Sequence, residues 1–249
     1  MRKFMIKIGV FLFKFRNFLF PLYILGLFIL FRPPVSKIFG SEQLLIVQDL
    51  VAALIAIFGL IVRGVVIGLA YIKRGGLNKK VYAENLVTEG MFSVSRNPLY
   101  VGNMLIYVGQ FLMFGNYFCF VIGFFSFFLI YECIIAAEES YLRNKFGLAF
   151  DEYCSDVRRW MPNLGKIGEA VTGMKFDWKK VVFKDYSTMC STLTILALLQ
   201  LWKVLANKGY DNYELEVYGL ASFVVIVSLA AVIVRKIKKS TARFPVQES

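Results

Sequence analysis

Long apolar stretches alternate with polar segments along this chain. Six stretches approach the roughly 20 mostly apolar residues that a membrane-spanning helix needs, and they lie at about residues 11–31, 44–72, 98–114, 117–137, 187–205 and 217–234. The third and fourth are joined only by Gly-Asn-Tyr at 115–117, which predicts a tight antiparallel helical hairpin. The pattern therefore predicts an all-α, polytopic membrane protein with about six transmembrane helices.

Composition narrows the class of protein further. Hydrophobic residues make up 58% of the 249 residues, and 29 Lys and Arg against 17 Asp and Glu give a formal net charge of +12. Positive charge is typical of nucleic-acid-binding proteins, but a soluble domain could not bury this much Phe, Leu, Ile and Val. We therefore expect no nucleic-acid partner and assign the basic residues to loops on the cytoplasmic side of a membrane.

The first apolar stretch has some features of a signal peptide. It lacks a small-residue cleavage site, and Lys14 and Arg16 interrupt it, so we expect it to be retained as the first membrane helix. The two long basic side chains then reach back toward the membrane surface.

Loop charges predict the orientation of the helices. Basic residues concentrate in segments 73–96 (Lys73, Arg74, Lys79 and Lys80) and 138–185 and in the tail from Arg235, whereas segments 32–43, 115–117 and 206–216 are poor in Lys and Arg. The positive-inside rule therefore places both termini and both long polar segments in the cytoplasm. The membrane is then a bacterial inner membrane, or the endoplasmic reticulum of a eukaryote.

Two kinds of side chain limit the chemistry. The chain has no histidine, which excludes His-based metal sites and imidazole general bases. The four cysteines form no CxxC pair, and three of them lie in apolar stretches. We interpret them as small buried hydrophobic residues and expect no metal.

Two polar segments at the ends of neighbouring predicted helices carry the candidate chemistry. The first, residues 84–102, reads ENLVTEGMFSVSRNPLYVG. In the second, residues 138–164, Glu138 and Glu139 close the fourth apolar stretch, and Gly147 is placed to end that helix. A short amphipathic helix around 150–159 is expected to lie in the membrane interface. Because both segments face one compartment, they can cover a single site.

Specific residues recur at characteristic spacing in the two segments. The first contains Leu86, Val87, Gly90, Phe92, Arg96, Asn97, Pro98, Tyr100 and Gly102, and the second contains Glu138, Glu139, Leu142, Phe146, Gly147, Tyr153, Arg159 and Pro162. In this order, the pattern resembles that of the isoprenylcysteine carboxyl methyltransferase and phospholipid methyltransferase group of integral membrane enzymes. The resemblance covers roughly residues 72–164.

The resemblance implies S-adenosyl-L-methionine as cofactor and a lipophilic, membrane-resident acceptor. It assigns cofactor binding to Leu86, Val87, Gly90, Phe92, Asn97, Pro98, Tyr100 and Glu138, with Arg96 and Glu139 as catalytic residues. A carboxylate suits the sulfonium and ammonium groups of this cofactor, and an Arg suits its carboxylate. The resemblance also divides the chain into N-terminal helices at 1–72, a methyltransferase core at 73–164 and a C-terminal extension at 165–249.

Several of these residues also have a purely structural interpretation. Glu139 and Arg143 are spaced as an i, i+4 ion pair on a helix surface, and Pro98 is placed to begin a helix. Arg63 and Glu132 lie inside apolar stretches, where an ionisable group suggests function. They either contact the substrate or pair with each other.

The acceptor is left open by the sequence. Prenylcysteine-modifying members have an Arg about one helical turn before the Glu pair, where this chain has Ile134 and Ile135, so a prenylcysteine is disfavoured. An amine acceptor would lose its proton to Glu139 or Glu132. The alternatives are a phospholipid or amine N-methyltransferase, a membrane sterol reductase and a non-catalytic scaffold. The two C-terminal helices either shape a lipid entrance or form a homodimer surface.

Overall fold

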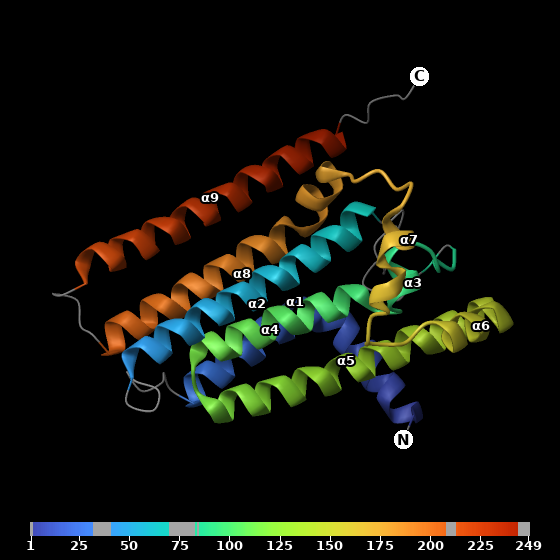
Figure 1. The fold of residues 1–249 in the computed structure, drawn as a ribbon, viewed down its shortest axis with the longest axis horizontal. Coiled ribbons are helices and arrows are strands. Elements are labelled where there is room, and N and C mark those ends of the chain that lie inside the picture. Colours follow the sequence, from blue (N-terminus) through green and yellow to red (C-terminus); the bar gives the residue numbers. More distant parts are fainter. Residues whose placement is uncertain (1, 32–40, 70–82, 84, 208–212, 244–249) are drawn as a thin grey trace.

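The structure is a computed structural model that describes residues 2–31, 41–69, 83, 85–207 and 213–243 (Figure 1). The basic residues Lys73, Arg74, Lys79 and Lys80, on which part of the predicted orientation depends, lie outside these ranges. Within them the chain is helical and forms no β-strand. This confirms the predicted all-α class.

All six predicted apolar stretches form helices over the residues that the structure describes. They are α1 (Arg2–Phe31), α2 (Glu42–Leu69), α4 (Pro98–Phe114), α5 (Tyr117–Phe146), α8 (Trp178–Asn207) and α9 (Glu214–Arg243). By length and composition, five of them are able to cross a membrane, while α4, with 17 residues, is shorter. Large apolar side chains such as Leu54, Phe125 and Ile226 remain exposed on these helices, as expected of surfaces that face lipid. The chain is therefore a multi-pass membrane protein.

The helices extend beyond the apolar stretches. Helix α1 begins at Arg2, α8 begins at Trp178 and α9 continues to Arg243. Helix α5 continues through the Glu pair to Phe146 and ends at Gly147, whose φ of 55° is available to glycine. Hydropathy detects only the part of a helix that is apolar, whereas backbone hydrogen bonds carry the helix on until a residue interrupts them.

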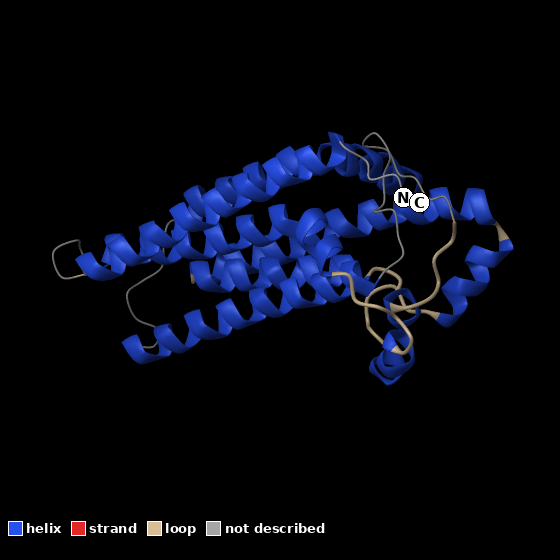
Figure 2. Ribbon diagram, turned by 90° about the horizontal axis from the view of Figure 1, so that it is seen from above, coloured by secondary structure: helices blue, strands red, loops and turns tan. Residues whose placement is uncertain are grey.

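Short helices gather at one end of the bundle. They are α3 (Met91–Val94), α6 (Leu148–Asp156), α7 (Ile167–Val171) and the 3₁₀ helix η1 (Leu164–Lys166). Helix α1 begins and α9 ends at this same end (Figure 1), and Figure 2 shows the arrangement from above. The predicted α4–α5 hairpin is confirmed, because only Gly115 and Asn116 separate the two helices. The bundle end that holds the short helices is called the motif end below.

The long helices pack in a chain of pairs. Helix α2 packs on α4 and α8, α1 on α5, α5 on α4, and α9 on α8. Helices α2 and α4 approach closely at Gly59 and Gly102, where an added Cβ on Gly102 would lie 2.9 Å from the Gly59 carbonyl oxygen and 2.6 Å from Cγ of Arg63. This close approach brings the Arg63 side chain against α4.

Candidate active site

The two motif segments are joined by hydrogen bonds at the motif end. The Arg96 amide donates to the Arg158 carbonyl at 2.9 Å, and the Asn163 amide donates to the Val94 carbonyl at 2.9 Å. The Asn97 side chain donates to the Arg159 carbonyl at 3.1 Å. Residues 91–98 and 157–163 therefore form one unit, as expected from two segments that face one compartment.

A network of charged side chains lies beneath this unit. Arg159 donates to both oxygens of Glu139, at 3.0 and 2.6 Å, and its third nitrogen donates to Glu132 at 2.7 Å. Arg96 approaches the same Glu139 at 3.2 Å, and the Trp160 indole donates to Glu132 at 2.5 Å. Charge-assisted, bidentate contacts of this kind fix the orientation of a carboxylate. The network positions Glu139 at the end of α5.

Two ion pairs that the sequence left as alternatives do not form. Arg63 does not pair with Glu132: it makes a bidentate contact with Asp185 of α8, with Nε 3.0 Å from Oδ2, and its Nη1 donates to Asn103 of α4. Arg63 faces α4 and α8, whereas Glu132 on α5 faces the 159–160 segment. The sequence of a helix alone does not determine which neighbouring helix packs against each of its faces.

The second of these alternatives is the i, i+4 contact of Glu139 with Arg143. Arg143 instead contacts Asp151, with Nε 2.6 Å from Oδ1. Helix α6 begins directly after Gly147 and packs against α5, which brings Asp151 to Arg143. Glu139 therefore contacts Arg159 and Arg96 instead of Arg143.

Glu138 points away from that network, because adjacent residues on an α-helix are about 100° apart. Its Oε1 accepts a hydrogen bond from the Tyr100 hydroxyl at 2.9 Å. Arg16 of α1 lies close enough to both groups to interact with them electrostatically. The Tyr100 ring lies against Tyr131, with ring centroids 4.8 Å apart. Glu138 therefore faces the interior of the bundle.

One of the predicted cofactor-binding residues, Leu86, lies on an apolar cluster. Leu86 packs against Phe150, Tyr153 and Val157. Burial raises the pKa of Tyr153 above its usual range, so its hydroxyl stays protonated and donates to the Phe92 carbonyl at 2.8 Å. The cluster holds the chain at Leu86 against α6.

Gly90 has a backbone role in the same region. It precedes α3 with a φ of 60°, a conformation that L side chains rarely adopt. A Cβ at Gly90 would also lie 2.7 Å from Cε of Met174. The positive φ of this turn therefore favours glycine, whereas the flexible end of Met174 could move away from a Cβ.

A cavity of about 1470 Å³ connects these features. Apart from Gly90 and Glu132, all the predicted site residues line it: Arg63, Leu86, Val87, Phe92, Arg96, Asn97, Pro98, Tyr100, Glu138 and Glu139. From the motif end the cavity continues along α1, α4 and α8, where its walls become apolar at Phe20, Ile24, Leu199 and Trp202. Gly90 and Glu132 do not line the cavity, and Glu132 accepts hydrogen bonds from Arg159 and Trp160.

The polar end of the cavity fits S-adenosylmethionine. Nε of Arg96 is buried without a hydrogen-bond partner among the described residues, while its Nη1 donates to the Cys154 carbonyl at 3.1 Å. A carboxylate such as that of the cofactor can accept from this nitrogen. Glu138 supplies negative charge for the sulfonium and ammonium groups of the cofactor. Leu86 and Val87 supply an apolar surface for its adenine.

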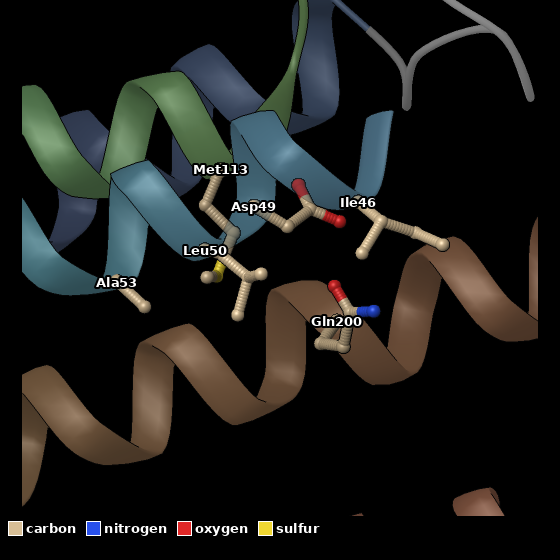
Figure 3. Close-up of a pocket in the computed structure, with 6 residues that line it drawn as sticks. All are labelled: Ile46, Asp49, Leu50, Ala53, Met113 and Gln200. Carbon is tan, nitrogen blue, oxygen red and sulfur yellow. The ribbon is translucent and has the colours of Figure 1, made fainter. Parts of the chain in front are cut away.

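A second, smaller cavity lies at the opposite end of the bundle (Figure 3). Its volume is about 240 Å³, and it is lined by Ile46, Asp49, Leu50, Ala53, Met113 and Gln200. Beside it, Lys203 of α8 forms an ion pair with Asp49 of α2 and donates to the Met113 carbonyl at 3.3 Å. These contacts join α2, α4 and α8 and include none of the predicted site residues.

Sequence reasoning missed the roles of several residues in and around the large cavity. Arg159 stood in the motif without a role, and Arg16 was interpreted only as a residue that reaches the membrane surface. An ionisable residue in an apolar stretch was a usable signal for Arg16. The polar residues of α8 carried no motif, so their contribution depended entirely on packing.

Comparison with known proteins gives a family match for part of the chain. No curated protein and no solved structure matches the chain. Residues 44–149 match the family model described as phospholipid methyltransferase. This segment begins in α2, contains the first motif segment, and ends in α6, just beyond the Glu pair and Gly147. The match bears out the predicted resemblance to the isoprenylcysteine carboxyl methyltransferase and phospholipid methyltransferase group over residues 44–149 of this multi-pass membrane protein.

Proposed function

We propose that the protein is an S-adenosylmethionine-dependent methyltransferase that acts on a lipophilic acceptor within the membrane. The single observation that carries this proposal is the cavity, because it joins the polar motif residues to an apolar channel along α1 and α8. A hydrophilic cofactor and a lipophilic acceptor need these two environments next to each other. The family match supports methyl transfer as the reaction.

Arg96 and Glu138 are the residues that would orient the cofactor. Nε of Arg96 is buried without a partner among the described residues, so a carboxylate can accept a hydrogen bond from it, and the Tyr100 hydroxyl donates to Glu138 at 2.9 Å. When bound, S-adenosylmethionine supplies an electrophilic methyl group on a sulfonium centre. The protein then contributes mainly by positioning the acceptor in line with that group.

The carboxylates differ in their suitability as a base. Glu139 is engaged through both oxygens by Arg159, and Glu132 is held by Arg159 and Trp160. Glu138 accepts from the Tyr100 hydroxyl and lines the cavity. If the acceptor is an amine, Glu138 is the carboxylate best placed to take its proton at a carboxylate oxygen, whereas a carboxylate or thiolate acceptor needs little base catalysis.

Lateral access suits an acceptor that arrives from lipid. Leu25 of α1 and Leu198 of α8 both line the cavity, and they are 55% and 47% exposed. Helix α1 packs on α5, while α8 packs on α2, α4 and α9. The cavity therefore has an apolar rim on two helices that belong to different pairs.

The first experiment measures binding of tritiated S-adenosylmethionine to the purified full-length chain in nanodiscs. We expect saturable binding that S-adenosylhomocysteine displaces and that NADPH does not. Displacement by NADPH but not by S-adenosylhomocysteine would support the reductase alternative. An absence of S-adenosylmethionine binding to folded protein would support the scaffold alternative. Either result overturns the proposal.

The second experiment identifies the acceptor class. The chain is incubated with labelled S-adenosylmethionine and lipids extracted from its source cells, and methylated products are resolved by mass spectrometry. We expect label in the organic phase, dependent on Glu138 and Arg96. Cofactor binding without any lipid-soluble product would contradict the lipophilic acceptor.

A further inference from the structure

Gln110 of α4 is a polar residue in the apolar part of the large cavity. It is 2% exposed and lines the cavity, and its Oε1 is buried without a hydrogen-bond partner among the described residues. Burying an amide oxygen that accepts no hydrogen bond costs free energy, so such a group in a native protein requires an explanation. A bound molecule that donates a hydrogen bond to this oxygen would remove the cost.

Gln110 lies on the face of α4 that lines the cavity. The lining residues Tyr100, Asn103, Tyr107 and Gln110 recur at three- and four-residue spacing, so they follow one face of the helix. At 1.5 Å per residue, Gln110 is about 15 Å along the helix from Tyr100, whose hydroxyl donates to Glu138 at the proposed cofactor site. The cavity therefore runs from the cofactor end to Gln110 along this face.

The cavity walls at the depth of Gln110 are apolar. Phe28 of α1 and Trp202 of α8 both line the cavity. The ring centroid of Phe28 lies 5.9 Å from that of Phe111, and the ring centroid of Trp202 lies 5.7 Å from that of Phe114. These contacts place Phe28 and Trp202 at the level of the last turns of α4. A molecule that reaches Gln110 is therefore surrounded mainly by apolar side chains.

The charged residues of the cavity wall lie toward the motif end. The Arg63 guanidinium meets α4 at Asn103, about 10 Å before Gln110 along the helix. It makes a bidentate contact with Asp185, and Arg63 and Asp185 are 2% and 1% exposed. This junction fixes α8 against α2 and α4, and it leaves the charge of Arg63 paired. The other charged residues that line the cavity, within the described part of the chain, are Arg16, Arg96, Glu138, Glu139 and Lys184.

A hydroxyl group matches the chemistry of the Gln110 amide. The amide offers a carbonyl acceptor and two N–H donors, and a hydroxyl can donate to the first and accept from the second. An ion is disfavoured here, because burying a charge without a partner costs more than burying a neutral polar group. Lys203, which follows Trp202, is already paired with Asp49 and does not line the cavity.

We propose that Gln110 is a specificity-determining residue that binds a hydroxyl group on the apolar chain of the acceptor, about 15 Å from the atom that receives the methyl group. The acceptor is then a lipid whose chain carries a hydroxyl toward its far end. This inference rests on the proposed function, because it takes the acceptor as the molecule that occupies the cavity.

The test uses the full-length chain in dodecyl maltoside, without cofactor. A methyl dodecanoate with a diazirine near the end of its chain labels the protein on irradiation, and mass spectrometry locates the adducts, which we expect near Phe28, Gln110 and Trp202. Two unlabelled isomers compete: methyl hydroxydodecanoate with the hydroxyl at the chain end, and the same ester with the hydroxyl at mid-chain. The first should suppress the adducts at a roughly tenfold lower concentration, as expected for one hydrogen bond.

Variants connect this concentration ratio to Gln110. Gln110→Met keeps the length of the side chain and removes the amide, so the two isomers should compete at similar concentrations. Gln110→Leu is a second variant with the same expected loss. Gln200→Met is the matched control and should keep the wild-type ratio, because Oε1 of Gln200 is also buried without a partner among the described residues but Gln200 lines the small cavity. Comparing ratios in one detergent cancels the partition of the isomers into micelles.

Three results would overturn the inference. They are equal competition by the two isomers in the wild type, which would mean that water alone satisfies Gln110, adducts confined to other surfaces, and a Gln110→Met ratio equal to that of Gln200→Met. Because the assay contains no cofactor, it is separable from the proposed function. A preference for the chain-end hydroxyl without S-adenosylmethionine binding would defeat only the methyltransferase assignment. Cofactor binding without this preference would defeat only the hydroxyl site.

Discussion

Arg159 and Glu139 form a bidentate ion pair at the motif end. Nε of Arg159 lies 3.0 Å from Oε1 of Glu139, and Nη2 of Arg159 lies 2.6 Å from Oε2 of Glu139. Glu139 ends the apolar part of α5, while Arg159 follows α6, 20 residues later in the chain. The pair holds the second motif segment onto α5. It also keeps Glu139 beside Arg96 at the cavity wall.

Arg159→Ala should therefore loosen the motif end. The side chain is 34% exposed, so with allowance for solvent screening we expect a loss of about 1–3 kcal/mol in unfolding free energy. Because Arg159 acts through Glu139, cofactor affinity should fall more than the melting temperature alone would indicate. Calorimetry with S-adenosylmethionine and thermal unfolding measure the two effects. Arg158→Ala, which removes the neighbouring exposed side chain, is the control and should change neither.

Glu138→Gln should weaken cofactor binding without unfolding the protein. The amide can still accept from Tyr100 but loses the charge that faces the cofactor's cationic groups. A lost charge-assisted contact costs on the order of 10- to 150-fold in affinity. Titration calorimetry at fixed salt provides the measurement, with Glu152→Gln on the exposed face of α6 as control. Wild-type affinity in folded Glu138→Gln would remove Glu138 from the cofactor site, and the same test applies to Arg96→Ala.

Asp185→Asn should be among the most destabilising substitutions in the chain. It leaves the buried Arg63 guanidinium without its charged partner, which typically costs about 3–5 kcal/mol. Asp151→Asn breaks the exposed ion pair with Arg143 and should cost less than about 1 kcal/mol. Chemical unfolding in detergent micelles compares the two variants. Similar losses for both would contradict the structural role assigned to the Arg63–Asp185 junction.

A small farnesylated cysteine should be a poor methyl acceptor compared with lipids extracted from the source cells. Positions 134 and 135 are buried isoleucines, and the cationic residue predicted to contact the substrate, Arg63, is engaged by Asp185. Turnover is compared at saturating S-adenosylmethionine, so that cofactor binding does not affect the result. Robust turnover of the analogue that Arg63→Ala abolishes would restore a prenylcysteine substrate.

Both motif segments and both chain termini should lie in the cytoplasm. The structure places the start of α1, the end of α9 and the short helices at one end of the bundle (Figure 1), which fits this expectation without naming the compartment. Single cysteines introduced at Lys175 and near Lys79, in a chain without native cysteines, are labelled with an impermeant maleimide in intact and in opened cells. We expect both positions to react only after opening. Opposite accessibility of the two positions would exclude a membrane topology with six spans.

The sequence by itself determined the helical class, the apolar helices and the motif residues of the cavity. These features are local: apolar runs of sufficient length must form helices in lipid, because each backbone group needs an internal hydrogen-bond partner. Gly147 ended α5 as expected, and Pro98 began α4, through conformational preferences that act within a few residues. The spacing of the motif residues was enough to bring Arg96 and Glu138 to one site by resemblance.

Only the tertiary structure decided which charges meet and what covers the cavity. Arg63 pairs with Asp185, 122 residues away, and Glu132 pairs with Arg159, because the rotation of each helix depends on the packing of all its neighbours. The close approach of Gly59 and Gly102 sets one such rotation. The polar residues of α8 follow no motif, and they become part of the cavity only because α8 packs on α2 and α4.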